Sequence, residues 1–588
     1  MKVKKRGIVL VVSLIIMAVL LVLVGMYLSS LLTEKRAADR GKFVLQALEL
    51  AEAGASHAQS ELRQRIRQTM RANLSAANVN QAGNNLANYF NAPQPLGLLQ
   101  DYAGFSIIGN TANIFLGPIN LTNWGNYWSI VTVAPNGNPQ NPDTDVYVFS
   151  YNYSIEAQGL VTQTTPNTTR RVGLSQGTFS VTVQRGNFAR YALFTNHHRT
   201  AGGTTVWFTA NTNFTGPVHS NERFSFANNP SATFSEAVTQ HLSTARFYNN
   251  GATRLLNADS NPACCQEAGC EDTPCIDKPI FNAGFTRGAD EINLPSSVVQ
   301  QDLLNQATGG QNDGPWANGI YLPNDGANNL VGGIYIKGNA SNVTMSVDSD
   351  NPVYTITRGT NTKRITVDYS ANQTTVENVS GSGGTPPGTY NGIPNGIGDA
   401  GIIIYDNGSI SNFSGNVQSD TQLTVASNSD ISISNHIMYE SFTPDDVGTS
   451  ENELSVAGFT NLLGIVTWNG NVRISTGAPN NLNIHAVVMA AGRNGVFTVD
   501  NYNSGAPRGV VTLLGGAITD FYGAFGTFSG SNPVSGYGRN FVYDSRMLGG
   551  MAPPYFPTIT SFDANVSDAN GDGVDDLGNR LIWEDRGV

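Results

Sequence analysis

Four cysteines within twelve residues are the most concentrated group of reactive side chains in this sequence of 588 residues. They are Cys264, Cys265, Cys270 and Cys275. Such a cluster in an exported chain predicts disulfides, because disulfides form and persist in oxidising compartments. A bond between the two adjacent cysteines is strained, so we expect each to pair with Cys270 or Cys275. The alternative is a zinc site, but CC-x4-C-x4-C is an uncommon zinc spacing and no histidine lies nearby.

A second candidate site is the segment DANGDGVDDLGN near the C-terminus. Its alternating oxygen-bearing side chains match the first half of an EF-hand-type calcium loop, with Gly573 at the sharp bend. The predicted ligands are the side chains of Asp568, Asn570, Asp572 and Asp576 and the backbone carbonyl of Val574. Position twelve is Asn579 in place of a bidentate Glu, so Asp575 or Asp576 must supply that carboxylate. We expect Ca²⁺ to fold the tail; the alternative is a solvated acidic turn.

The histidines and paired acids give little support for catalysis. His197 and His198 are adjacent, so on a strand they point to opposite faces, and His219 and His485 are expected to be structural. Two acid pairs have the composition that a polysaccharide lyase or glycosidase needs. They are Asp348 with Asp350 and Asp445 with Asp446. Acids on turns are usually solvated, and no H-E-x-x-H or P-loop motif occurs. We therefore expect a protein that is not an enzyme.

Composition limits the class of protein further. Charged residues make up 13%, there are 63 glycines, and the net charge is −11. Low charge with abundant Gly but many aromatic residues favours turn-dense β structure over disorder. The acidic balance disfavours broad nucleic-acid binding. The length indicates three or four structural units.

The N-terminus supplies the element that positions the rest. A basic tip, residues 2–6, ends at Gly7, and residues 8–32 form an uncharged apolar run without proline. As a helix this run spans roughly 38 Å, enough to cross a bilayer with some tilt. The basic tip should stay cytoplasmic, so the bulk of the chain is expected outside.

The helical pattern continues through residues 33–74 as an amphipathic segment. An apolar stripe recurs there at spacings of three and four, which predicts one helix running on from the membrane segment. Its members are Phe43, Ala47, Ala51, Gly54, Ala58, Leu62, Ile66 and Met70. A secretory signal peptide would have a shorter apolar core and no helix beyond it. The alternative is a plain single-pass anchor with a juxtamembrane helix.

This organisation resembles the N-terminus of type IV pilin-like proteins. The start KKRGIVLVVSLI and the stretch QALELAEAGASHAQSEL look most like the minor pilins called PilX and the K-type pseudopilin. The resemblance implies that a prepilin peptidase cuts after Gly7 and leaves Ile8 as the first mature residue. Major pilins carry Glu at mature position five, where this chain has Val12. Without that carboxylate the subunit cannot neutralise a neighbour's buried amino group, which favours a place at the filament tip.

The segment 75–186 is expected to complete a pilin-like unit. Residues 75–120 read as loops with one short helix at most. Alternating apolar and polar residues then predict strands at 126–134, 145–161 and 170–185. Antiparallel strands laid on the amphipathic helix would bury its stripe, which is also the arrangement that the pilin resemblance implies.

Residues 187–560 form a different module. The pieces FARYALFTN, FTGPVHSNERFSF, NPSATFSEAVT, GVVTLLGGAITDFYGAFGTF, GYGRNFVYDSRML and MAPPYFPT resemble an uncharacterised domain of the DUF4900 type. That domain is often found behind pilin-like N-termini in bacterial envelope proteins, and it brings no established chemistry. Short apolar strands ended by Gly, Asn or Asp predict a β-solenoid or a winding β-sandwich.

Three features stand out within this module. The stretch LPSSVVQQDLLNQATGG predicts a helix that stops at Gly309 and Gly310. Two insertions, 250–290 with the cysteines and 380–399 rich in Gly and Pro, are expected to be exposed loops, and the latter is a binding loop or a mere connector. Three tryptophans are either sugar-stacking residues or core residues, namely Trp207, Trp316 and Trp468.

These observations predict an α+β, mainly β protein with a leader (1–7), a membrane helix (8–32), an amphipathic half (33–74), a pilin-like β domain (75–186), a β-rich head (187–560) and a tail (561–588). We expect a minor pilin or pseudopilin-like subunit that primes or caps a filament and presents its head for surface contact. Its partners would be other minor and major pilins and the prepilin peptidase. It would lie in the inner membrane before assembly and in a surface filament afterwards. The alternative is a single-pass anchored β-helix protein that binds or cleaves polysaccharide.

Overall fold

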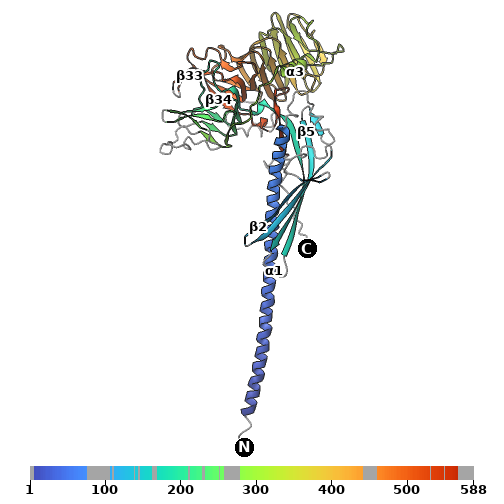
Figure 1. The fold of residues 1–588 in the computed structure, drawn as a ribbon. Helices are drawn as coiled ribbons and strands as arrows, with labels where there is room; N and C mark the ends of the chain where they lie inside the picture. Colours follow the sequence, from blue (N-terminus) through green and yellow to red (C-terminus); the bar gives the residue numbers. More distant parts are fainter. Residues whose placement is uncertain are drawn as a thin grey trace. The chain divides into compact units, whose positions relative to one another are not determined.

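The chain divides into two compact units, which are described separately (Figure 1). The helix–sheet unit comprises residues 1–185 and 561–588, and the solenoid unit comprises residues 186–560. The computed structural model describes residues 6–75, 106–108, 111–122, 124–137, 140–143, 146–161, 169–209, 212–227, 232–249, 252–256, 279–440, 460–529, 532–548 and 550–566. The protein is mainly β with one long N-terminal helix, so the predicted fold class is confirmed.

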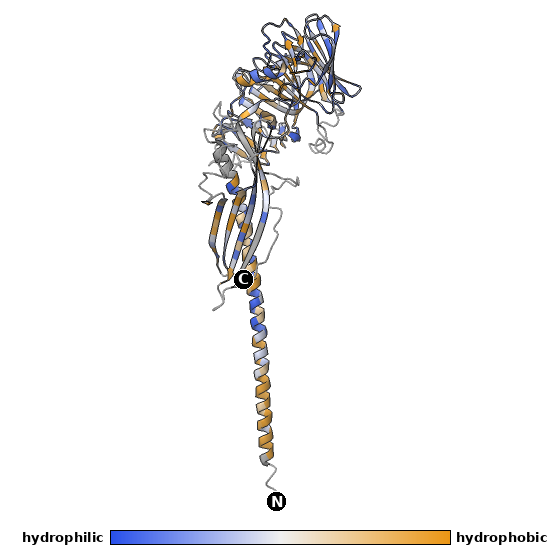
Figure 2. Cartoon of the chain, turned by 90° about the vertical axis from the view of Figure 1, so that its right-hand side faces the viewer, coloured by the Kyte–Doolittle hydropathy of each residue, from blue (hydrophilic) through white to orange (hydrophobic). Residues whose placement is uncertain are grey.

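The helix–sheet unit is built on α1 (Arg6–Ser75), a single helix of 70 residues. It contains no proline, and Leu, Ala, Glu, Gln and Arg, which favour helices, dominate its second half. Its first part, residues 8–32, is coloured as hydrophobic along its length in Figure 2, and side chains such as Ile8 and Leu21 are about two-thirds exposed. Among the described residues this is the one helix long and apolar enough to cross a membrane.

The second half of α1 packs against a mainly antiparallel sheet. The sheet order is β1 (Ser106–Ile108), β2 (Thr111–Leu121), β3 (Gly125–Pro135), β5 (Val146–Val161), β6 (Thr169–Asn187) and β35 (Thr558–Val566), with β4 (Gln140–Asp143) pairing to β5. The three predicted strands are confirmed as β3, β5 and β6. The prediction of loops and a helix before residue 120 is wrong for β1 and β2. A Gly117–Pro118 pair shifts the register of β2 on β3 and breaks the alternation that marks a strand.

Small residues let the helix approach the sheet closely. The predicted stripe members Ala47, Ala51, Ala58, Leu62 and Ile66 are all fully buried. Ser129 on β3 donates a hydrogen bond from Oγ to the carbonyl of Gly54 at 2.8 Å. A Cβ atom placed on Gly159 of β5 would lie 2.0 Å from the Ala47 carbonyl oxygen. Glycine at this position is therefore a packing requirement.

The solenoid unit winds short parallel strands into two ladders. One ladder contains β18 (Ile334–Lys337), β24 (Ile402–Asp406), β26 (Gln422–Ser427), β28 (Leu462–Thr467), β30 (Leu482–Ala490) and β32 (Pro507–Phe521). The other contains β19 (Asn342–Asp348), β25 (Ile410–Val417), β27 (Ile431–Tyr439), β29 (Val472–Ile474) and β31 (Phe497–Val499). Parallel, in-register pairing between successive coils identifies a β-solenoid and excludes a winding antiparallel sandwich for this part.

The stack of coils is not in sequence order. Strand β32 pairs in parallel with β7 (Leu193–His197), which pairs with β9 (Val218–Ser220), then β12 (Val238–Gln240) and β16 (Phe285–Arg287). The longest strand of the unit, β32, therefore pairs with its first strand, β7. We call this junction between β32 and β7 the seam, and it lies inside the stack, between coils on both sides.

The remaining elements cover the coils. Strand β17 (Gly319–Tyr321) pairs antiparallel with β18. A second antiparallel series starts at β19, and each strand pairs with the next: β20 (Asn351–Arg358), β21 (Asn361–Asp368), β22 (Gln373–Ser380) and β23 (Gly388–Asn391). Strand β34 (Asn532–Val542) pairs with β32 and β33 (Gly526–Ser529). The other strands are β8 (Asn213–Phe214), β10 (Ser225–Phe226), β11 (Thr233–Phe234), β13 (Ala245–Asn249), β14 (Ala252–Leu256) and β15 (Ile280–Phe281). Two short 3-10 helices are η2 (Phe188–Arg190) and η3 (Ser545–Met547).

Two sequence predictions within this unit have clear outcomes. The predicted helix is confirmed as α3 (Ser297–Thr308), which Ser296 caps and which ends at Gly309 in the left-handed conformation (φ 64°). The prediction of exposed loops over 250–290 and 380–399 is wrong in part. The first range contains β14, β15 and β16, and Phe285 on β16 is fully buried. In the second range, residues 388–391 form β23 on the edge of β22. Tyr390 buries its side chain there, and that burial fixes the strand.

Candidate functional site

Several predicted site residues fall outside the part of the chain that the structure describes. These are Cys264, Cys265, Cys270 and Cys275, the calcium-loop residues Asp568, Asn570, Asp572, Val574 and Asp576, and the acids Asp445 and Asp446. They stay predictions. The processing residues Gly7 and Ile8 lie in the first turn of α1.

The remaining predicted acids, Asp348 and Asp350, have structural roles. Asp348 forms an ion pair with Arg364, and Asp350 occupies a turn at φ 66°. Two short patterns match catalytic or nucleotide-binding motifs by letters alone. GLSQG, residues 173–177, lies within β6, and GIGDAG, residues 396–401, precedes β24. Neither opens a helix, as a nucleophile elbow or a dinucleotide-binding turn requires.

Three histidines are buried, as expected for structural residues. Burial lowers the pKa of His198 and of His485 to about 3, and that of His219 to about 4. His219 is bonded on both ring nitrogens, to Thr239 Oγ1 at 2.7 Å and Asn221 Oδ1 at 3.0 Å. Trp468 is likewise a core residue, 4% exposed.

The two other tryptophans are partly exposed and pack against tyrosines. Trp316 lies 4.7 Å from Tyr321 between ring centroids, and Trp207 lies 6.5 Å from Tyr248. Each ring is thus engaged on one side by a neighbour from its own unit. Neither lines the pocket described next.

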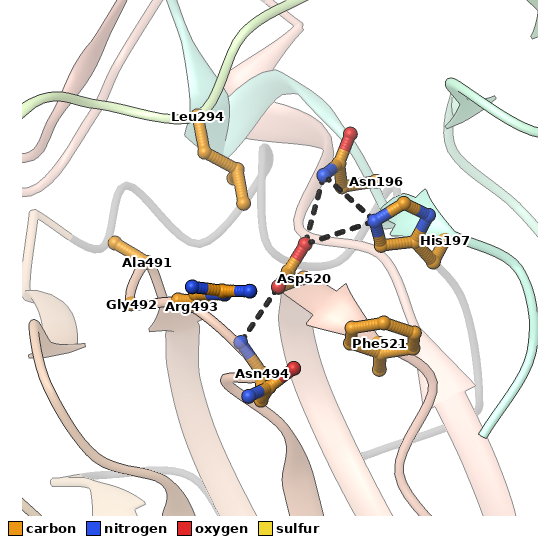
Figure 3. A pocket seen from close by; sticks show the side chains of 9 residues that line it. All are labelled: Asn196, His197, Leu294, Ala491, Gly492, Arg493, Asn494, Asp520 and Phe521. Atoms are coloured by element: carbon orange, nitrogen blue, oxygen red, sulfur yellow. Dashed lines mark hydrogen bonds and ion pairs between the residues drawn. The ribbon is translucent and has the colours of Figure 1, made fainter. Parts of the chain in front are cut away.

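An open pocket of about 400 Å³ lies at the seam (Figure 3). It lies where β7 and β32 end beside the turn that follows β30. Its lining residues are Asn196, His197, Leu294, Ala491, Gly492, Arg493, Asn494, Asp520 and Phe521. The register of β32 on β7 aligns Thr519 with Thr195 and Phe521 with His197. That register places Asp520 directly beside Asn196.

Asp520 is the hub of the polar network in this pocket. Its carboxylate accepts a bond from Asn196 Nδ2 at 2.8 Å and one from the backbone N–H of Asn494 at 2.7 Å. Asn196 in turn accepts from Asn221 Nδ2 at 2.9 Å. Asp520 is only 6% exposed, so these donors replace the water that the carboxylate loses.

His197 lies between two carboxylates. Its Nδ1 is 3.0 Å from Glu222 Oε1, and its Nε2 is 3.8 Å from Asp520 Oδ1. Its ring stacks on Phe521 with centroids 4.4 Å apart. Glu222 also pairs with Arg199 at 3.2 Å. Both ring nitrogens thus face polar groups of the chain itself, which orients the imidazole firmly.

The turn after β30 presents Arg493 to the pocket. Gly495 N–H donates to the Gly492 carbonyl at 2.8 Å and closes this turn. A Cβ on Gly492 would fall 1.9 Å from the Trp468 carbonyl oxygen, so this position requires glycine. Asn494 adopts φ 63°, a conformation that Asn tolerates well. Asp520 holds the same turn through the Asn494 N–H, so the carboxylate positions the arginine without pairing to it.

The arrangement is suited to binding. It offers a cation, amide groups, an imidazole and two apolar side chains around an open hollow. The sequence reasoning treated His197 only as one of a pair with His198, and it singled out none of Asn196, Arg493 or Asp520. No local spacing could reveal them, because 324 positions separate Asn196 from Asp520.

A family model described as "Domain of unknown function (DUF4900)" matches residues 147–241. This confirms the resemblance for the pieces between residues 188 and 239. The expected extent, 187–560, differs from the match, which begins in β5 and ends just after β12. The match covers less than half of the chain and therefore does not establish membership of the family.

A comparison with curated proteins gave no match. Among solved structures, the chain is similar to the competence-associated pilin ComZ from Thermus thermophilus at 11% identity. The alignment covers 90% of this chain and 98% of that chain with a TM-score of 0.28. This score is too low to show a shared fold, and no conclusion about this chain is drawn from it.

Proposed function

We propose that this chain is a pilin-like minor subunit of a type IV pilus or related filament, with the solenoid unit as a surface-contact head. One observation carries the proposal. The single helix α1 is uncovered over its apolar half and buries a stripe of small residues against an antiparallel sheet over its other half. A helix of this kind serves as a membrane anchor before assembly and as a packing element between subunits afterwards.

The partners in this proposal follow from the exposed half of α1. In the membrane its apolar side chains contact lipid, and in a filament they contact the equivalent helices of other minor and major pilins. A prepilin peptidase would remove residues 1–7 between Gly7 and Ile8. Val12 provides no carboxylate for a neighbour's amino terminus, which supports a position at the tip of the filament.

N-terminal sequencing of the native protein, combined with filament isolation, tests this proposal. The expected result is Ile8 as the first residue, with the protein recovered in sheared filaments. Gly7→Val should block processing and leave the protein in the inner membrane. Gly25→Ala is a matched control, because no atom lies within 4 Å of a Cβ at Gly25. Met1 retained in the native protein, with no filament fraction, would exclude the proposal.

A second candidate is a single-pass anchored surface protein that contacts polysaccharide without entering a filament. The pocket at the seam favours it, since that pocket belongs to the solenoid unit alone. We propose binding and not cleavage. Asp520 accepts two hydrogen bonds and His197 faces two carboxylates, so both groups already have partners within the chain. Filament fractionation separates the two candidates.

A further inference from the structure

Arg493, the cation in the pocket at the seam, has no anionic partner among the residues that the structure describes. Arg199 pairs with Glu222, and Asp520 is occupied by Asn196 and the Asn494 N–H. Arg493 is exposed, and among the described residues its guanidinium makes no ion pair or hydrogen bond. Its turn is nevertheless fixed by a buried carboxylate and a glycine that tolerates no side chain. An unpaired guanidinium on a fixed turn is suited to bidentate recognition of a carboxylate.

The groups around Arg493 indicate which class of ligand the pocket can bind. The side-chain amide of Asn494 also lies at the pocket and offers both a donor and an acceptor, as hydroxyl groups require (Figure 3). Leu294 and Phe521 add apolar surface of the kind that contacts the C–H face of a sugar ring. A volume of about 400 Å³ falls in the usual range for small-molecule sites, about 300–1,000 Å³. The pocket is open to solvent, so a longer chain can continue beyond it.

We propose that this pocket binds an acidic sugar residue of a polysaccharide, with Arg493 contacting the carboxylate and Asn494 contacting hydroxyls. Asp520 is a positioning residue that holds the Arg493 turn. This inference rests on the part of the proposed function that makes the solenoid unit a contact surface. It is independent of whether the anchor enters a filament.

The test is calorimetric titration of the full chain in detergent micelles with oligogalacturonate as the probe. The comparison ligand is the same oligosaccharide with its carboxyl groups reduced to alcohols. We expect binding of the acidic form and at least tenfold weaker binding of the reduced form. Arg493→Gln should weaken binding at least tenfold. The affinity of Arg493→Lys should lie between those of Arg493→Gln and the parent, because Lys keeps the charge but loses the planar pair of N–H donors. Arg364→Gln, on β21 and outside the pocket, is the matched control and should bind as the parent does.

Three outcomes would overturn the inference. They are no binding of the acidic oligosaccharide, equal binding of its reduced form, or an unchanged affinity in Arg493→Gln. A short peptide with a free carboxyl terminus that competes equally with the oligosaccharide would also overturn the inference, since the site would then recognise a carboxylate without recognising a sugar. Binding with no recovery in filaments would leave the pocket assignment standing and exclude the filament role. Filament incorporation without binding of the oligosaccharide would leave the filament role standing and exclude the pocket assignment.

Discussion

Asn196 and Asp520 share a hydrogen bond of 2.8 Å although they are 324 positions apart in the sequence. This bond crosses the seam, where the longest strand of the solenoid unit pairs with its first strand. The same carboxylate holds the Arg493 turn. One residue therefore links β32 to β7 and shapes the pocket.

Replacing Asp520 should weaken both stability and binding. Asp520→Ala leaves the Asn196 amide and the Asn494 N–H without their acceptor, at a cost of about 1–3 kcal/mol for each group that stays buried. Thermal unfolding of the full chain in detergent should show a lower midpoint, and the oligogalacturonate affinity should fall as well. Asp348→Ala is the control, because that exposed ion pair with Arg364 is worth about 1 kcal/mol or less. Equal shifts in the two variants would contradict the role assigned to Asp520.

The contact between α1 and β5 should be intolerant of a single added methyl group. Gly159→Ala would place a Cβ 2.0 Å from the Ala47 carbonyl oxygen and 2.7 Å from the Ala51 nitrogen. Overpacking of this kind costs about 1–3 kcal/mol, so we expect faster tryptic cleavage within the helix–sheet unit. In contrast, Gly41→Ala meets no atom within 4 Å and should be neutral or stabilise the helix by about 0.5–1 kcal/mol. Similar proteolysis rates in both variants would argue against the close helix–sheet contact.

Acid should destabilise the solenoid unit through its buried histidines. The folded-state pKa is lowered from 6.5 to about 3 in His198 and His485 and to about 4 in His219, chiefly by burial. The folded chain keeps these rings neutral while the unfolded chain protonates them below pH 6.5. The free energy of unfolding should therefore fall as the pH drops from 6.5 towards 4, by at most about 1.4 kcal/mol per pH unit for each histidine.

The variant His198→Gln separates this effect from acid protonation of carboxylates. Between pH 6.5 and 4, the slope of the unfolding free energy against pH should be smaller in this variant by up to about 1.4 kcal/mol per pH unit, which is the contribution of one proton. Denaturant titrations at several pH values measure the slope directly. An unchanged slope would mean that His198 is protonated in the folded state at these pH values.

Calcium should stabilise the tail if the acidic segment near the C-terminus is a calcium loop. Adding millimolar Ca²⁺ should raise the melting temperature of the full chain, and chelation should reverse the rise. Asp568→Ala combined with Asp572→Ala removes two predicted ligands and should abolish the shift. A parent protein that melts at the same temperature with and without Ca²⁺ would exclude the site.

The four cysteines should resist alkylation in the exported protein. If Cys264 and Cys265 pair with Cys270 and Cys275, a maleimide reagent should label none of them before reduction and all four after it. Mass spectrometry of the peptides reads the pairing. Zinc in the purified protein, released together with free thiols on chelation, would instead support the zinc alternative.

Most of the fold could be predicted from local patterns in the sequence. The spacing from Ala47 to Ile66 identifies the buried face of α1, and strands β3, β5 and β6 follow from strict alternation. Strand β2 escaped detection because Gly117–Pro118 interrupts its alternation. The capping of α3 by Ser296 and Gly309 was readable for the same local reasons.

The pocket was not predictable in this way, because it depends on which coil lies next to which. The register that aligns Phe521 with His197 is set by the packing of the whole stack. No periodicity in either strand specifies that β32 adds onto β7. The polar residues at the two strand ends therefore read as ordinary loop residues until the seam is known.

The solenoid unit is inserted within the helix–sheet unit, so two crossings connect them. The chain enters it after residue 185 and leaves it after residue 560. Beside these crossings, Phe188 N–H donates to the Pro557 carbonyl and Asn187 Nδ2 donates to the Phe556 carbonyl. A protease cut at the first crossing would break the covalent link between α1 and the solenoid unit, and the pairing of β35 with β6 would then be the attachment that remains. A cut at the second crossing would leave that covalent link intact, so release of the head from the anchor depends on the first crossing.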